Sequence, residues 1–412
     1  MQQVPLQQNK YLTLILLCLG YFIDFYDLSI MGSGYSELIR DQFNITSTTQ
    51  IQQTYLLISN FQTLGIFIGA VLFGILGDKI GRAKAIRYSI LLYSLATLLA
   101  VYTHSLPLFI LLRVLAYIGL ATEFSTSTVL IIELFPARFA SWGSALLYSF
   151  GVLGGITATS LSFVSWELMF ICGGLAGLIL YMARGKIQES EEFLYTQQKM
   201  NVSKISIIRL LTEPHYIRSL IRYLLIIMPY YAIITMMFIF PNYIIKHYTL
   251  GEATKILLMG FFIGNIISSF ASAAFNNFFS NYKMFIGCAL GLFVVLMTIF
   301  PLINEKYLFW YACGLGVLGG GYPISWAQQV AREYPAEIRA LASNVLFALG
   351  RASSIGFNFL IAWWLAGGSS SFISGARTSV IAIFILAFIS VLFSANNYRK
   401  EKITPLPQAA NN

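Results

Sequence analysis

The segment Gly74-Ile75-Leu76-Gly77-Asp78-Lys79-Ile80-Gly81-Arg82-Ala83-Lys84 separates two long apolar runs of the sequence. Glycine adopts backbone angles that other residues avoid, so Gly74, Gly77 and Gly81 allow a tight bend. Asp78 can pair with Arg82 one helical turn later and can also face the N-terminus of a neighbouring helix. The segment predicts a polar turn between two helices, with Gly74, Asp78, Gly81 and Arg82 as gate residues that stabilise one of two conformations. An ordinary basic loop is the alternative.

The runs on either side of this turn belong to a chain whose composition excludes a water-soluble globule. Its 412 residues are 57% hydrophobic and only 10% charged, against about 25% charged residues in ordinary soluble proteins. The apolar runs are continuous rather than alternating, which favours membrane helices over barrel strands. The expected class is therefore an all-α integral membrane protein.

Twelve apolar stretches are long enough to cross a bilayer, which requires about 20 residues of helix. They lie near residues 11–31, 52–76, 88–103, 107–132, 141–163, 166–183, 219–243, 254–275, 284–302, 307–331, 341–364 and 377–395. The sequence thus predicts twelve transmembrane helices, which form two six-helix pseudo-symmetric halves.

The division into halves follows from the longest polar interruption and from an internal repeat. The expected domains are an N-terminal half 1–184, a linker 185–218, a C-terminal half 219–396 and a tail 397–412. Within the linker, VSKISIIRLL suits a helix on the membrane surface, although an unattached linker is the alternative. ELFPARF from Glu133 and EYPAEIR from Glu333 begin similar segments 200 residues apart. Duplicated halves are typical of transporters with a substrate site at the midplane.

The basic residues predict the orientation of the chain. Of the 26 Lys and Arg residues, 19 fall on the side of both termini, five on the other side and two inside spans. Because Lys and Arg favour the cytoplasmic side, both termini and the linker are expected there. The net charge of +9 is spread over short loops, unlike the basic face of a nucleic-acid-binding protein. The polar start MQQVPLQQNK lacks a cleavage site, so no removable signal peptide is expected.

Five ionisable residues stand out inside the predicted spans, where each costs about 2.5 to 3.5 kcal/mol on insertion scales. They are Asp24, Asp27, Arg113, Glu123 and Arg351. Asp24 and Asp27 are three residues apart and share a helix face. If the first and fourth helices face one cavity, Asp27 can pair with Arg113.

A carboxylate beside an arginine in a partly dry cavity can exchange its ion pair for a proton, because burial raises its pKa and the cation lowers it. We therefore expect proton coupling at Asp27 and then Glu123, with Arg113 switching the pKa and Asp24 as a further candidate. The alternative is that these charges only neutralise one another and stabilise the bundle.

The glycine-rich turn resembles the signature loop of the major facilitator superfamily, and the spans, linker and half-repeat agree with that family over nearly the whole chain. Asp24-Phe25-Tyr26-Asp27-Leu28, together with Arg113 and Glu123, is similar to the metabolite:proton symporter branch, and sialate and sugar porters share parts of the pattern. The sequence departs from the signature loop at Ala83 and from the symporter pattern at Asp24, Ala116 and Tyr117. The linker piece IQESEEF (187–193) resembles an acidic segment of the same symporters. The resemblance implies the major facilitator fold.

Arg351 is the main candidate for binding substrate, because the predicted helices of the second half offer it no obvious carboxylate. A guanidinium suits a carboxylate by its two-pronged geometry, which favours an anionic or zwitterionic substrate. Pairing with helix carbonyls or with an acid of the first half is the alternative. Further candidates for a polar cavity are Tyr26, Tyr117, Tyr230, Asn265, Trp326 and Gln329. The alternative for each is an ordinary hydrogen bond between helices.

These features favour a secondary active transporter that imports a small organic anion or zwitterionic metabolite with protons, by alternating access. An exporter or uniporter without proton coupling is the alternative. An enzyme is not expected, since no span carries a nucleophile with an activating base. No cofactor or metal site is expected, because the histidines lie at span ends or in loops. We expect a functional monomer in a bacterial inner (plasma) membrane, with small-molecule substrate, protons and lipid as partners and no nucleic acid.

Overall fold

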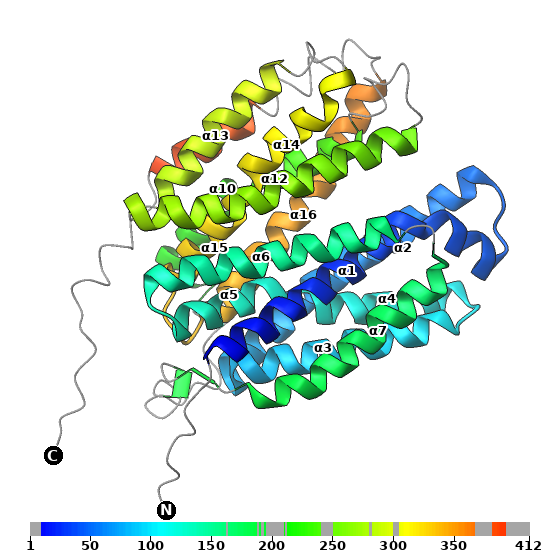
Figure 1. Cartoon of the computed structure of the whole chain (residues 1–412), viewed down its shortest axis with the longest axis horizontal. Coiled ribbons are helices and arrows are strands. Elements are labelled where there is room, and N and C mark those ends of the chain that lie inside the picture. The colour runs from blue at the N-terminus through cyan, green and yellow to red at the C-terminus, as the bar shows by residue number, and fades with distance from the viewer. Residues whose placement is uncertain are drawn as a thin grey trace, which may run out of the picture. The chain divides into compact units, whose positions relative to one another are not determined.

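The computed structural model of the protein describes residues 10–161, 164–187, 189–190, 193–194, 210, 212–239, 250–279, 282–299, 305–366 and 381–392. Regular structure in these ranges is helical (Figure 1). Within them, eight helical stretches are long and apolar enough to cross a membrane, and shorter apolar helices cover 285–296 and 381–392. The described residues of each of the twelve predicted spans lie mainly on one helix or on two consecutive helices. Most of the predicted surface helix in the linker lies outside the described residues.

The chain forms two compact units. The first contains Met1–Ile217 and Ala336–Ala352, and the second contains Arg218–Pro335 and Ser353–Asn412. The first unit therefore includes the beginning of a helix that the sequence places in the second half.

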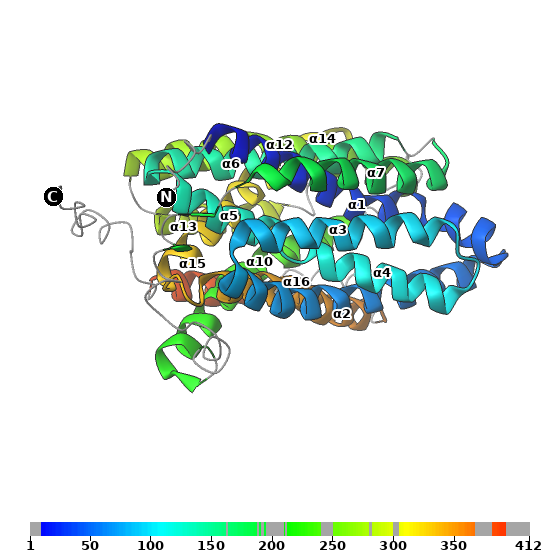
Figure 2. The same ribbon diagram turned by 90° about the horizontal axis from the view of Figure 1, so that it is seen from below.

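The first unit is a bundle of apolar helices with short connections. Its helices are α1 (Lys10–Phe43), α2 (Thr48–Ile80), α3 (Arg82–Val101), α4 (Leu106–Leu120), α5 (Glu123–Leu134), α6 (Ala137–Ser160), α7 (Trp166–Ala183), the 3-10 turn η1 (Arg184–Lys186) and the start of α16 (Arg339–Ala366). α1 packs along α6 and α7, and α3 packs against α4 and α7 (Figures 1 and 2). Small residues allow the closest approaches: a side chain at Gly69 of α2 would overlap the backbone of Ile118 in α4.

The polar extension of α1 beyond the predicted span is fixed by one side chain. Gln42 is buried, and its Nε2 donates to the carbonyls of Ala100 at 2.8 Å and Thr103 at 2.6 Å. These carbonyls lie at the end of α3, where helical acceptors lack partners within the helix. The contact explains why α1 continues to Phe43 although its apolar run ends near residue 31.

Two spans predicted as continuous helices are broken. The span 107–132 is divided between α4 and α5 at Thr122, whose φ of −119° and ψ of −10° depart from helical values. The span 307–331 is divided between α14 (Leu308–Gly319) and α15 (Gly321–Glu333) at Gly320. A side chain at Gly320 would overlap the backbone of Asn265, so close packing requires glycine there. Apolar composition alone does not indicate either break.

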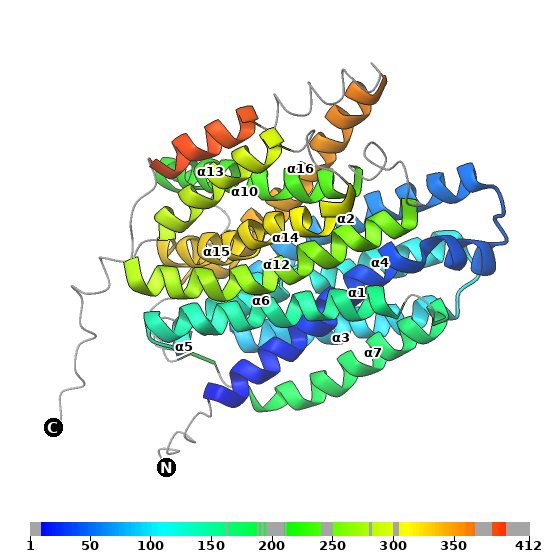
Figure 3. The same cartoon turned by 45° about the horizontal axis from the view of Figure 1, so that its top comes forward.

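The second unit contains α10 (Pro214–Ile239, from Arg218), α12 (Leu250–Phe279), α13 (Tyr282–Ile299), η3 (Glu305–Tyr307), α14, α15, the end of α16 and a helix over 381–392. α12 packs along α14 (Figure 3). Aromatic side chains join α15 to α10, since the Trp326 indole donates to the Tyr223 carbonyl at 2.9 Å and the Tyr322 hydroxyl donates to the Ile226 carbonyl.

Candidate functional site

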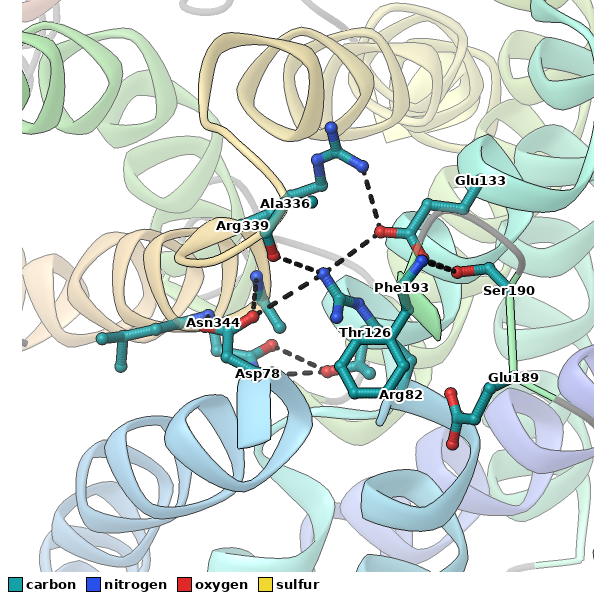
Figure 4. Close-up of polar contacts among 12 residues, drawn as sticks. Asp78, Arg82, Thr126, Glu133, Glu189, Ser190, Phe193, Ala336, Arg339 and Asn344 are labelled. Carbon is teal, nitrogen blue, oxygen red and sulfur yellow. Dashed lines mark hydrogen bonds and ion pairs between the residues drawn. The ribbon is translucent and has the colours of Figure 1, made fainter. Parts of the chain in front are cut away.

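Two clusters of buried charge occupy the first unit, and the first lies at the turn between α2 and α3 (Figure 4). Asp78 accepts hydrogen bonds from the backbone N–H groups of Ala340 at 3.1 Å and Leu341 at 3.0 Å. These N–H groups belong to the first turn of α16, where unpaired donors and the helix dipole favour a carboxylate. Arg82 lies 3.7 Å from the same carboxylate. Asp78 therefore joins the end of α2 to the start of α16.

Arg82 connects this contact to α5. Its guanidinium lies 3.2 Å from the Glu133 carboxylate and donates to the Ala336 carbonyl at 2.6 Å. Arg339 pairs with the same Glu133 carboxylate at 3.0 Å. The side chains of Arg82 and Glu133 are fully buried, so each depends on the other for compensation of its charge. Figure 4 shows Arg82 between Asp78 and Glu133.

The segment after α7 completes this cluster. The Glu189 carboxylate accepts from the backbone N–H groups of Ala83 at 3.1 Å and Lys84 at 3.0 Å, so it caps the start of α3. Burial raises the pKa of Glu189, and these two hydrogen bonds oppose the rise. Gly81 precedes the helix with a φ of 108°, and a side chain there would overlap the Glu189 carboxylate.

Two further contacts attach the same segment to the cluster. Ser190 donates to Glu133 at 2.6 Å, and the Phe193 ring lies 4.8 Å from the Arg82 guanidinium carbon. Nearby, Gly74 packs against Leu341 with no room for a side chain. The four gate residues that the sequence indicated, Gly74, Asp78, Gly81 and Arg82, thus lie in one network.

The second cluster lies within the bundle and is centred on Asp27. Asp27 and Arg113 are 3.3 Å apart, and both side chains are almost completely buried. The Thr97 hydroxyl donates to the second Asp27 oxygen at 2.8 Å and accepts from Arg113 at 3.4 Å. The pair that the sequence allowed between α1 and α4 is therefore present, with Thr97 of α3 as a third member.

Aromatic rings cover the Arg113 guanidinium. Its central carbon lies 5.2 Å from the Tyr117 ring and 5.0 Å from the Phe170 ring. Such contacts stabilise a cation where water is excluded. Tyr117, predicted as a substrate residue, thus contacts the arginine that pairs with Asp27.

Glu123 has a different partner from those considered in the sequence. It forms a two-pronged ion pair with Arg184, in which one contact measures 3.0 Å and the other joins Arg184 Nη2 to Glu123 Oε1. Arg184 also donates to the Leu16 carbonyl at 3.2 Å and the Ile86 carbonyl at 3.4 Å. A side chain at Gly20 would overlap this guanidinium. The pair therefore joins α1, α3, α5 and the end of α7.

Asp24 is buried between these two pairs. Its Oδ1 has no hydrogen-bond partner in the described part of the chain. Glu123, Arg351, Asp27 and Arg184 all lie within electrostatic reach of its carboxyl group. Arg351 is partly buried on α16, with its guanidinium carbon 5.6 Å from the Phe347 ring. Asp24, an acid within electrostatic reach of Arg351, thus belongs to the first half of the sequence.

The other predicted substrate residues are buried and have contacts within or between helices. The Tyr26 hydroxyl donates to the Met169 carbonyl at 3.3 Å. In the second unit, Asn265 donates to the Phe261 carbonyl of its own helix at 2.9 Å, and Trp326 donates to α10 as described above. Tyr230 packs on Tyr231 with 5.2 Å between ring centres, and Gln329 is buried in α15. Tyr230, Asn265, Trp326 and Gln329 belong to the second unit, whereas Tyr26 and the charged clusters belong to the first.

Sequence reasoning missed several members of both clusters. Arg184 is only the last residue of the predicted N-terminal half, Glu133 is noted only as part of the repeat, and Thr97, Glu189 and Arg339 are not singled out. A charge count offered one signal: the spans of the first half hold four carboxylates, Asp24, Asp27, Glu123 and Glu167, but only Arg113 as a cation. That excess required a further buried cation close to a span end, where Arg184 lies.

Comparison with known proteins identifies the architecture that carries these clusters. Residues 17–357 match the sequence profile of the Major Facilitator Superfamily. The chain belongs to this superfamily. It is 27% identical over 353 residues to a metabolite transport protein of Haemophilus influenzae, covering 81% of this chain and 84% of the relative.

Two other bacterial members of the superfamily align with nearly the whole chain. The benzoate transport protein of Acinetobacter baylyi is 22% identical (95% of this chain, 91% of the relative). The sialic acid transporter NanX of Escherichia coli is 23% identical (90% and 92%). The solved proton:xylose symporter XylE superposes with a TM-score of 0.72 at 15% identity, covering 95% of this chain and 98% of XylE.

The fold and superfamily that the sequence predicted are thereby confirmed. The protein is a multi-pass, all-helical member of the Major Facilitator Superfamily and a secondary transporter of small metabolites, not an enzyme.

Proposed function

We propose that this transporter imports a small organic anion or zwitterion together with protons. The observation that carries the proposal is the buried contact of Asp27 with Arg113 at 3.3 Å, shared with Thr97. A carboxylate in this environment exists either as the partner of the cation or as a neutral acid, because an isolated buried charge is costly. Proton uptake by Asp27 would therefore remove its attraction for Arg113.

Loss of that attraction links protonation to conformation. Asp27 belongs to α1, Arg113 to α4 and Thr97 to α3, so a proton on Asp27 changes the contacts among three helices. In alternating access, proton and substrate would favour the same change of state, which couples their fluxes. Glu123, with Arg184 in two-pronged contact, is the less favoured proton site.

The Asp78 cluster would stabilise one state of this cycle. It joins α2 to residues 340–341, which the sequence assigns to a predicted C-terminal half 219–396, whereas α2 belongs to the predicted half 1–184. If the halves move relative to each other, these hydrogen bonds must break and reform. The distribution of Lys and Arg supports a cytoplasmic position for this cluster, for both termini and for the linker.

The anionic or zwitterionic class of substrate is supported by chemistry and by relatives. Arg351 and Arg113 both lie within electrostatic reach of Tyr117. Benzoate and sialic acid, which two relatives transport according to their names, are carboxylates. We further propose a monomer in the plasma membrane as the functional form.

The test is uptake of labelled organic acids, amino acids and sugars into proteoliposomes, with and without an acid-outside pH gradient. We expect wild type to accumulate one anionic compound only with the gradient. Asp27→Asn should abolish accumulation but retain exchange, because the neutral side chain mimics the protonated state. Asp41→Asn, an exposed position on the same helix, is the matched control and should behave as wild type.

Two results would contradict the proposal. Equilibration that ignores the gradient in wild type would indicate a uniporter. Gradient-driven accumulation by Asp27→Asn at the wild-type level would exclude Asp27 as the coupling residue.

A further inference from the structure

One edge of the Arg113 guanidinium is not used by the contact with Asp27. Asp27 and Thr97 both contact Nη1. The Nε and Nη2 atoms are buried and have no acceptor within hydrogen-bond geometry among the described residues, while the Tyr117 hydroxyl is a hydrogen-bond partner of the same guanidinium group. A buried donor without an acceptor costs about 1 to 3 kcal/mol, and more on a charged group. The Nε–Nη2 edge is therefore able to donate to a further acceptor during the transport cycle.

The surroundings of Arg113 restrict what that acceptor can be. Tyr117 lies 5.2 Å and Phe170 5.0 Å from the guanidinium carbon. The two rings contact the guanidinium group and Asp27 contacts Nη1. A ligand can still approach in the guanidinium plane, towards Nε and Nη2. Two parallel donors in one plane match the two oxygens of a carboxylate.

The charge of the cluster also favours an anion at this edge when Asp27 is neutral. Arg113 then loses its only acidic partner at hydrogen-bond distance in the described residues, while Arg351 remains within electrostatic reach of Tyr117. Two cations near one tyrosine attract a negative ligand in a medium of low dielectric constant. An anion binds there most strongly when a proton occupies Asp27.

We propose that the Nε–Nη2 edge of Arg113 binds the carboxylate of the substrate, with Tyr117 and Phe170 beside it. The inference rests on the proposed function and deepens it, because substrate and Asp27 then compete for one guanidinium. A ligand whose carboxylate meets this edge beside two aromatic rings is expected to be flat next to its carboxylate. The substrate class is thus a planar monocarboxylate, with an aromatic or conjugated group attached to the carboxyl carbon.

Binding of benzoate, nicotinate and cyclohexanecarboxylate to the purified full-length chain tests the inference. Affinities are measured by isothermal titration calorimetry at pH 5.5 and pH 7.5. Wild type should bind a planar probe more tightly at pH 5.5 and at least tenfold more tightly than the non-planar one. Arg113→Lys keeps the charge but cannot form the two-pronged contact, so planar probes should bind at least tenfold more weakly.

Two more variants separate this role from a structural one. Asp27→Asn should bind planar probes at pH 7.5 as tightly as wild type does at pH 5.5. Phe170→Leu removes one ring and should reduce the preference for planar over non-planar probes, even if Arg113→Lys fails to fold.

The outcomes distinguish the inference from the proposed function. Binding that does not depend on pH in wild type contradicts proton coupling. Proton-linked binding with the same affinity in Arg113→Lys, or with unchanged selectivity in Phe170→Leu, overturns the inference alone. Failure of wild type to bind either planar probe overturns the substrate class.

Discussion

The two divided spans of this transporter differ in backbone angles and in chemistry, since Thr122 has φ −119° and ψ −10° whereas Gly320 has φ −67° and ψ −45°. In the first unit, α5 begins after the break with Glu123, which forms an ion pair with Arg184. In the second unit, α15 begins with Gly321, whose N–H donates to the Ser268 hydroxyl at 2.8 Å. One break is stabilised by opposite charges and the other by a neutral hydrogen bond.

The same contrast extends to the interior of each unit. Among the described residues, seven charged residues are buried as whole residues, and all belong to the first unit: Asp24, Asp27, Asp78, Arg82, Arg113, Glu123 and Arg184. The Glu133 side chain, which is also buried, belongs to the same unit. The buried polar residues of the second unit are neutral, such as Asn265, Asn276 and Gln328. Neutral amides and hydroxyls do not change ionisation at physiological pH. Proton dependence is therefore expected to originate in the first unit.

The largest effect on stability is expected when one charge is removed where α5 begins. Glu123→Gln leaves Arg184 as a buried cation without its acid, and we expect a loss of about 3 to 5 kcal/mol in the free energy of unfolding. Ser268→Ala at the second break removes a neutral acceptor and should cost about 1 kcal/mol. Unfolding in detergent, followed by circular dichroism, measures both.

The double variant Glu123→Gln/Arg184→Gln provides the control for charge balance. It should be more stable than Glu123→Gln, because neither charge is left alone. A Glu123→Gln variant as stable as Ser268→Ala would mean that the two breaks are energetically alike.

A smaller effect is expected from Gly20→Ala, which leaves every charge in place. The added methyl group would overlap the Arg184 guanidinium, and the resulting crowding should cost about 1 to 3 kcal/mol. Gly291→Ala in α13 is the matched control, since its added methyl group meets no atom within 4 Å. Equal melting temperatures for the two variants would contradict the assigned geometry of the Glu123 pair.

A third comparison is between a charged contact at the turn that joins α2 to α3 and a neutral contact of α12. Asp78→Asn weakens charge-assisted hydrogen bonds to α16 by about 1 to 2 kcal/mol, and initial uptake in proteoliposomes should fall about 5- to 30-fold. Asn276→Ser alters a neutral contact with Ser325, which measures 2.9 Å, and should reduce uptake less than about threefold. A larger defect in Asn276→Ser would assign the gate to the second unit instead.

The smallest effect concerns the pH dependence contributed by Glu189. Because its pKa is raised in the folded protein, the folded state retains the Glu189 proton to higher pH than the unfolded chain. The stabilising contribution is full below the unfolded pKa of about 4.3 and is lost as pH rises through the folded pKa. Relative to Glu189→Gln, wild type should therefore lose stability across this window.

Melting temperatures measured between pH 4 and pH 8 check this sign. Glu37→Gln, at an exposed acidic position of α1, is the control and should follow wild type. A wild type that gains stability over Glu189→Gln as pH rises would show that the hydrogen bonds to Ala83 and Lys84 outweigh burial.

The sequence predicted the helices because long apolar runs have few alternatives in a membrane. It also indicated the Asp27 to Arg113 pair, since opposite charges inside two spans need each other. The breaks at Thr122 and Gly320 were not predicted, because each residue also occurs within helices and only packing against neighbours decides. Glu123 and Arg184 are 61 residues apart, and no local pattern reports such a contact.

The contacts of Arg184 have a consequence for mutational tolerance. Its guanidinium donates to main-chain carbonyls of residues 16 and 86, and every amino acid supplies a carbonyl. Leu16 and Ile86 can therefore be exchanged for other apolar residues without loss of these hydrogen bonds. At Gly20, even the methyl group of alanine would overlap the Arg184 guanidinium. In a saturation mutagenesis screen, the position with the fewest atoms should be the most restrictive of the three.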